Sequence, residues 1–104
     1  EHVQKPTETL TNLKELLRCG GFLVCVTPNG SVERLTKDPV RYHREWGFVH
    51  PYFLDAEFYR RALRGEKYFL TTVPHDMSLL PKWDRLSPVE GPLDGPELVL
   101  VLLR

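Results

Sequence analysis

The stretch LTNLKELLRCGGFLVCVTPN (residues 10–29) decides the fold. Its first half places leucines on one face of a helix that we expect to end near Arg18. These leucines are Leu10, Leu13, Leu16 and Leu17. Gly20 and Gly21 follow, where a helix C-cap requires the positive φ that glycine adopts without steric cost. Residues 22–26 (FLVCV) then run apolar without alternation, which is typical of a strand buried on both faces. Together they predict half of an α/β unit with a parallel sheet.

Three further elements are predicted after this stretch. Asp55 can cap a helix that begins about Ala56 and stops at Gly65. Residues 67–73 (KYFLTTV) combine aromatic with β-branched side chains, which is typical of a strand. Residues 97–103 (ELVLVLL) form a last apolar run, which also predicts a strand.

Two long connections separate these elements. Residues 32–49 are polar and aromatic, with Pro39 in their middle, and we expect an excursion with at most a short helix. Residues 74–96 hold most of the prolines and are expected to be irregular. Connections of this length in compact domains are usually functional lids or mobile segments. The first connection is therefore a candidate for part of a binding site.

Composition narrows the class of protein. The 104 residues allow one small domain. Lys and Arg together number 14, as do Asp and Glu, so no charge excess favours a nucleic-acid partner. No run approaches the ~18 apolar residues that span a bilayer, and no signal-peptide pattern is present, so we expect no membrane partner. Cys19 and Cys25 are expected to be free thiols in a reducing cytoplasm.

Four motifs resemble those of a known family. They are Glu1-His2, the turn Leu17-Arg18-Cys19-Gly20-Gly21, Thr27-Pro28-Asn29 at the end of the first strand, and YHREW at residues 42–46. The pattern is similar to the second half of class I S-adenosylmethionine-dependent methyltransferases, in the branch that acts on small molecules. There an EH pair follows the fourth strand, an L-(K/R)-P-G-G turn leads into the fifth, and TPN ends it. An H-x-R-E-(W/Y) segment precedes the next helix, and Cys19 stands where proline is usual.

The resemblance implies an α/β fold, a partial Rossmann-like methyltransferase fold. Residues 1–104 would be the C-terminal half of the methyltransferase domain, and the start inside a motif suggests a fragment. The sheet would be three-stranded and mixed, with flanking helices. Its strands would be the family's fifth, seventh and sixth, with the strand at residues 97–103 antiparallel between its neighbours. The family's fourth strand would normally cover residues 22–26, so we expect a bare apolar edge that pairs with a second copy.

Candidate site residues lie where ligands bind in open α/β sheets, beyond the carboxyl ends of the strands. The resemblance implies that Glu1 contacts the cofactor and that His2 is the catalytic base, since His is a usual general base. The implied contacts to the small-molecule methyl acceptor are Asn29, His43, Glu45 and Trp46.

Each candidate also has a plain structural interpretation. His2 can be a histidine without a role, and Asn29 a turn residue. The residues His43, Glu45 and Trp46 can form a polar and aromatic cluster that anchors their loop. Both interpretations stay open at the level of sequence.

No metal site is expected, because His50 and the pair His75-Asp76 lack ligand spacing with each other or with the cysteines.

The family's glycine-rich cofactor loop and its ribose-binding acidic residue are absent from the chain, so S-adenosylmethionine would be bound by the complete enzyme. Two hypotheses follow: the substrate-side half of a small-molecule methyltransferase, or a non-catalytic, degenerate module that mediates self-association or partner binding.

Overall fold

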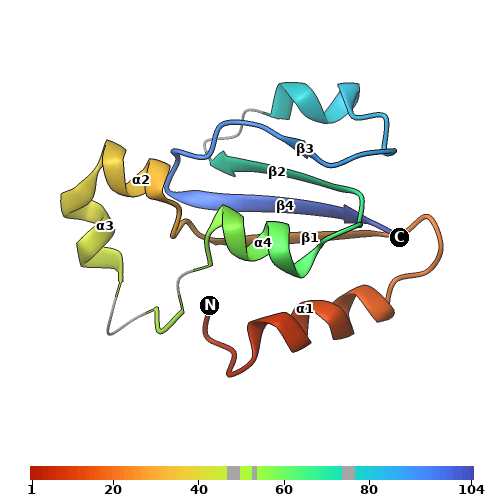
Figure 1. Cartoon of the computed structure of the whole chain (residues 1–104), viewed down its shortest axis with the longest axis horizontal. Helices are drawn as coiled ribbons and strands as arrows, with labels where there is room; N and C mark the ends of the chain where they lie inside the picture. Colours follow the sequence, from red (N-terminus) through yellow and green to blue (C-terminus); the bar gives the residue numbers. More distant parts are fainter. Residues whose placement is uncertain (47–49, 53, 74–76) are drawn as a thin grey trace.

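A computed structural model describes residues 1–46, 50–52, 54–73 and 77–104. Its helices and strands follow the chain in the order shown in Figure 1. They are α1 (Pro6–Glu15), β1 (Phe22–Pro28), α2 (Val32–Lys37), α3 (Pro39–Glu45), α4 (Ala56–Ala62), β2 (Tyr68–Val73), the 3-10 helix η1 (Met77–Lys82), β3 (Val89–Glu90) and β4 (Glu97–Leu103). None of these helices is long and apolar enough to cross a membrane.

The sheet has the strand order β1-β4-β2-β3. β4 is antiparallel to both of its neighbours, with Val101 opposite Val24 on one side and Phe69 on the other. The predicted α/β class, the mixed sheet and the central position of the last strand are therefore confirmed. The predicted count of three strands is wrong, because β3 adds a fourth strand parallel to β2. With only two residues, β3 is too short for any periodic pattern to mark it.

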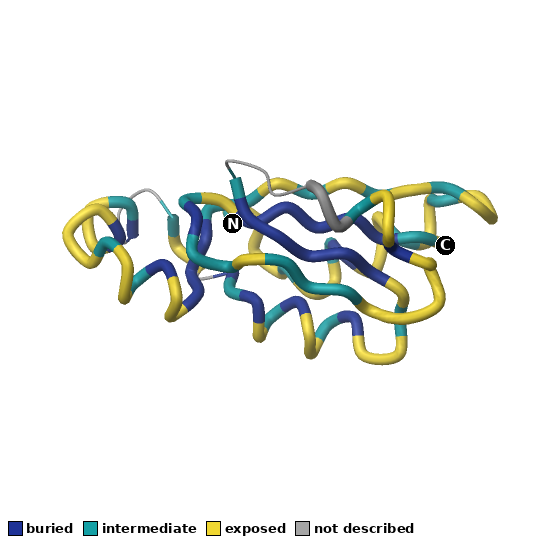
Figure 2. The backbone as a smooth tube through the Cα atoms, turned by 90° about the horizontal axis from the view of Figure 1, so that it is seen from above, coloured by how far each residue is buried: buried dark blue, intermediate teal, exposed yellow. Residues whose placement is uncertain are grey.

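One face of the sheet carries the main core. Figure 1 shows α4 in front of the strands and α1 below β1, and side chains of both helices meet those of β2 and β4 in the main core. Figure 2 shows the buried backbone concentrated in the central strands. Phe69, Trp83 and Val101 form a smaller core on the opposite face.

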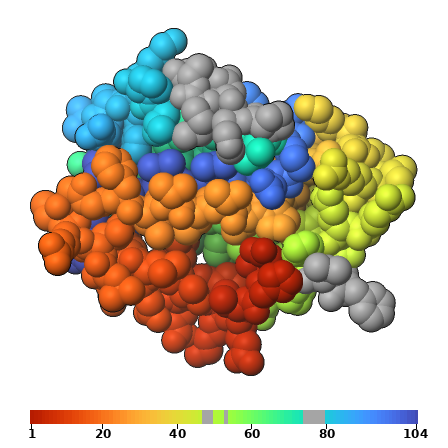
Figure 3. Space-filling view, turned by 180° about the vertical axis from the view of Figure 1, so that it is seen from behind, coloured from red at the N-terminus to blue at the C-terminus, as the bar shows by residue number. Residues whose placement is uncertain are grey.

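β1 departs from its prediction of burial on both faces. Its side chains alternate, with Leu23 and Cys25 packed against the main core and Phe22, Val24 and Val26 turned to the opposite face. The exposed fractions there are 48% for Phe22, 60% for Val24 and 53% for Val26. The reason is its position, because an edge strand has one neighbouring strand and little of the described chain lies over this face. Figure 3 shows β1 in orange along this open face.

α1 ends three residues earlier than predicted. The helix stops at Glu15, and Leu16 is 80% exposed instead of packed in the core. Gly20 has the expected positive φ of 77°, but it lies in a separate turn in which Gly21 N–H donates to the carbonyl of Arg18. The helix end is closed by Arg104, a residue far away in sequence. Its guanidinium donates to the carbonyls of Lys14, Glu15 and Leu17 at 3.2, 2.6 and 2.7 Å.

The first long connection forms two helices, where at most a short one was expected. Pro39, which the sequence suggests as an interruption, occupies the first turn of α3, where its missing N–H is not needed. Asp38 caps that helix by accepting a hydrogen bond from Arg41 N at 3.1 Å. The cap predicted for α4 is confirmed, since Asp55 accepts from Phe58 N at 2.6 Å.

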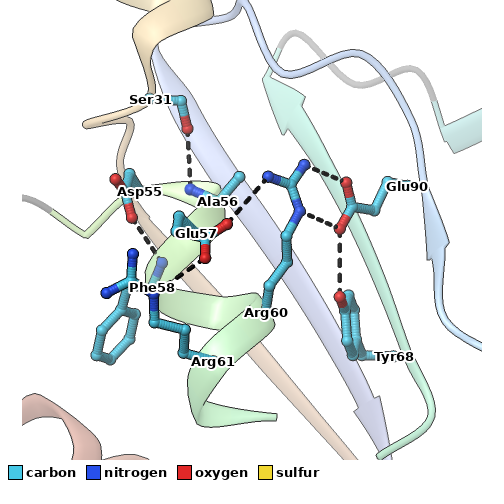
Figure 4. A network of polar contacts seen from close by, with 9 residues as sticks. All are labelled: Ser31, Asp55, Ala56, Glu57, Phe58, Arg60, Arg61, Tyr68 and Glu90. Carbon is cyan, nitrogen blue, oxygen red and sulfur yellow. Dashed lines mark hydrogen bonds and ion pairs between the residues drawn. The ribbon is translucent and has the colours of Figure 1, made fainter. Parts of the chain in front are cut away.

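An ion pair joins α4 to β3, the strand at the opposite edge of the sheet from β1 (Figure 4). The Arg60 guanidinium donates to both oxygens of Glu90 in β3, at 3.0 and 2.6 Å. Tyr68 hydroxyl adds a hydrogen bond to the same carboxylate at 3.2 Å. Arg60 holds the pKa of the Glu90 carboxyl below its usual range, because its hydrogen bonds favour the charged form. The bidentate geometry explains why so short a strand as β3 keeps its place.

Candidate functional site

A pocket of about 370 Å³ opens at the carboxyl end of β1. Four separate segments contribute to it: the N-terminus, the end of β1, helix α3 with the following loop, and the start of β4. Its lining residues are Glu1, Val26, Thr27, Pro28, Arg41, Glu45, His50, Pro96 and Glu97. Figure 1 shows the N-terminus and α3 at this same end of the sheet. Two of the predicted site residues, Glu1 and Glu45, therefore meet in one pocket.

Glu45 is oriented by arginines of the two short helices. Arg41 Nε donates to Glu45 Oε1 at 2.6 Å, one helical turn away. The buried guanidinium of Arg34 approaches the other carboxylate oxygen at 4.0 Å and Asp38 at 3.6 Å. Arg41 itself reaches the pocket, so a positive group lies beside the Glu1 and Glu45 carboxylates. This mixture of charges suits a polar ligand better than a purely apolar one.

Glu1, His2 and His50 come together beside the pocket. His2 Nε2 lies 3.8 Å from Glu1 Oε1, and the imidazole rings of His2 and His50 have centroids 5.2 Å apart. One ligand-type atom from each of the three residues lies within 4.8 Å of the other two. His50 Nδ1 is buried and has no hydrogen-bond partner among the described residues. Trp46 packs edge-on against the His50 ring at 5.5 Å.

Asn29 is a buried residue whose side chain hydrogen-bonds to the backbone of other segments. The residue is only 2% exposed, and its Nδ2 donates to the carbonyls of Leu93 and Gly95 at 2.7 and 2.8 Å. Its Oδ1 accepts a hydrogen bond from Ser31 N at 2.9 Å. The amide therefore ties the end of β1 to the segment that leads into β4, which favours the interpretation as a turn residue.

The segment of residues 42–46 is anchored by its aromatic side chains. Tyr42 hydroxyl donates to the carbonyl of Gly30 at 3.0 Å, and buried Trp46 lies between Tyr42 and His50. His43 is exposed and contacts Tyr42 edge-on at 5.6 Å. Of the three residues in this segment that were expected to contact the methyl acceptor, only Glu45 lines the pocket. The other two fit the anchoring interpretation better.

Sequence reasoning missed His50 and Arg41. Arg41 precedes Glu45 by one helical turn, a spacing that becomes visible once residues 39–45 are recognised as a helix. His50 carries no such signal, because its partners Glu1 and His2 lie at the other end of a long stretch of sequence. His75, considered with it for metal binding, lies outside the described residues.

The described residues do not make a complete S-adenosylmethionine site. Their glycines with positive φ are Gly20 and Gly65, which precede β1 and β2 and so lie at the opposite end of the sheet from the pocket. Gly30 lies at the correct end, but its N–H and carbonyl are used by Leu54 and Tyr42. None of these three glycines therefore offers a free backbone cradle beside the pocket.

Comparison of the chain with protein-family models, curated proteins and solved structures found no match. We therefore infer what the chain does from its motifs, the order of its strands and the geometry of the pocket.

Proposed function

We propose that the chain is the substrate-side half of an S-adenosylmethionine-dependent methyltransferase that acts on a small molecule. The observation that carries the proposal is the strand order β1-β4-β2, with an antiparallel strand between two strands that run the same way. This order is the one implied by the resemblance for the last three strands of the family. The motifs Glu1-His2 and Thr27-Pro28-Asn29 support it from the sequence.

The pocket has properties suited to the substrate side of such an enzyme. Its volume of about 370 Å³ lies within the usual range for small-molecule sites, about 300–1,000 Å³. Methyl transfer depends mainly on holding the acceptor in line with the methyl group, and pocket walls supply that proximity. Glu1 lines this pocket and would contact the cofactor, while His2, 3.8 Å from the Glu1 carboxylate, would take a proton from the acceptor. We place the enzyme in the cytoplasm, where the free thiols of Cys19 and Cys25 stay reduced.

Calorimetric titration with S-adenosylhomocysteine tests the proposal. This compound, which S-adenosylmethionine becomes when it loses its methyl group, is titrated into this chain and into the longest natural polypeptide that contains it. We expect binding by the longer polypeptide alone, because the described residues lack a cofactor cradle. In that polypeptide Glu1→Gln is expected to weaken binding, while His43→Gln, an exposed change outside the pocket, leaves it unchanged. Failure of the longer polypeptide to bind would contradict the methyltransferase assignment.

The exposed side of β1 favours a second candidate function, a non-catalytic module that self-associates. β1 is an edge strand, and three apolar side chains on one of its faces are about half exposed. A hollow of about 340 Å³ follows this edge, between β1 and the helices α1 and α4. Apolar edge strands without a covering element pair readily with other chains. A second copy of β1 has the same apolar pattern, so we expect it to pair with this strand edge.

Val24→Lys tests self-association. The wild-type chain is expected to sediment as a dimer at high concentration, and the variant as a monomer, because a lysine on an edge strand opposes pairing. Sedimentation velocity measures both. Val40→Lys, which changes a valine on α3 that is also largely exposed, is the matched control and should leave the dimer intact. A wild-type chain that stays monomeric at all concentrations would contradict this function.

A further inference from the structure

We propose that Glu1, His2 and His50 bind a divalent transition-metal ion of the zinc type. The proposal departs from the sequence prediction of no metal site, and it does not depend on the methyltransferase assignment. What carries it is the meeting of two imidazoles and a carboxylate, with one candidate ligand atom of each within 4.8 Å of the others.

The donor set selects the class of ion. Two imidazole nitrogens and one carboxylate oxygen are the ligands of catalytic zinc sites and of non-haem iron(II) sites, which keep further positions open for water or substrate. Hard ions such as Mg²⁺ and Ca²⁺ prefer oxygen ligands alone, so two histidines disfavour them. We therefore expect affinity for Zn²⁺ and Co²⁺ and little for Mg²⁺.

The spacing of the donor atoms is close to that of a bound site. Ligands at about 2.1 Å from a tetrahedral ion lie about 3.4 Å from one another. His2 Nε2 and Glu1 Oε1 are already 3.8 Å apart. The third ligand lies within 4.8 Å, so the three side chains need to close by roughly 1 Å. His2 is free to make this adjustment because its side chain is 58% exposed.

His50 supplies a second, independent observation. A buried polar nitrogen without a partner is unfavourable, since it has lost water and gained nothing in exchange. His50 Nδ1 is in this position among the described residues. A metal ion bound at His50 Nδ1 would give this nitrogen a strong partner. Trp46 packs against the same ring and limits its rotation, as residues around metal ligands commonly do.

The proposed ion faces the pocket. Glu1 and His50 both line the pocket at the end of β1, so the open coordination positions would be reached from it. An ion there would act as a Lewis acid on a bound oxygen or nitrogen and lower the pKa of a bound water. We therefore expect the pocket to bind a small molecule whose hydroxyl, carboxylate or imidazole group completes the coordination of the ion.

Cobalt(II) absorption spectroscopy and zinc calorimetry test the site. The chain carries Cys19→Ser, which removes an exposed thiol, and an acetylated N-terminus, which prevents chelation by the α-amino group of Glu1. We expect one equivalent of Co²⁺ to bind, with visible d–d bands, and Zn²⁺ to displace it. His2→Gln and His50→Gln should each weaken binding by about tenfold or more, since even residues behind the ligands contribute that much.

His43→Gln is the matched control, because His43 is an exposed histidine outside the cluster. It should bind Co²⁺ as the parent chain does. His2 is itself largely exposed, so His2→Gln tests the site without risk to the fold. Absence of d–d bands at millimolar Co²⁺ would overturn the proposal. So would equal binding by the parent chain and His2→Gln.

Discussion

Replacing Asn29 with alanine is expected to lower the free energy of unfolding by about 2–4 kcal/mol. The buried amide makes three hydrogen bonds, to the carbonyls of Leu93 and Gly95 and to the N–H of Ser31. Alanine leaves these backbone groups without their partner, and at least one of the bonds is fully buried. Urea denaturation followed by circular dichroism measures the loss.

The matched control is Asn12→Ala on the exposed side of α1. It should change stability by less than about 0.5 kcal/mol, because Asn12 is exposed and alanine favours helix. The comparison also separates the two interpretations of Asn29. If Asn29 were a ligand contact rather than a structural anchor, Asn29→Ala would unfold at the same urea concentration as the wild type and lose only ligand affinity.

Gly95→Ala is expected to destabilise the chain by about 3 kcal/mol. A Cβ at this position would lie 2.2 Å from the carbonyl oxygen of Val73 and 2.7 Å from Thr72 Cβ. Because the first of these atoms belongs to the backbone of β2, the added methyl group can be accommodated only if β2 and the start of β4 move apart. Thermal unfolding by calorimetry gives the size of the effect.

Gly65→Ala provides the comparison. Gly65 has a positive φ of 84°, but a Cβ added there would have nothing within 4 Å, so only backbone strain of about 1 kcal/mol is expected. If Gly65→Ala were as damaging as Gly95→Ala, the close approach of the chain at Gly95 to β2 would not be the cause.

The existence of each long strand could be predicted from its own residues, but how far other elements cover the strand could not. Residues 97–103 were correctly expected as a strand from their uninterrupted apolar run, and their central position in the sheet was implied by the resemblance. The run at residues 22–26 has the same pattern, yet it lies at an edge with one open face. Local sequence shows that a segment is apolar, while its coverage depends on elements elsewhere in the chain.

The parts of the site that escaped prediction are those made by distant residues. The end of α1 could not be placed from its leucines, since Arg104 closes it. His50 joins Glu1 and His2 only after the chain has folded, so no spacing rule could find it. By contrast, Asp55 was correctly expected to cap α4, because a cap and its partner are three residues apart.

The place of β4 in the sheet governs the order in which the chain can fold. Among the described strands, β1 pairs with β4 alone and β2 pairs with it along its whole length, yet β4 follows both in the sequence. During synthesis the earlier strands leave the ribosome before the strand that joins them, with the leucines and tyrosines of their core exposed to water. Pairing then has to link residues as far apart as Phe22 and Leu103, and such distant contacts make folding slow. Until β4 has emerged, the nascent chain therefore exposes apolar surface that makes it prone to aggregation.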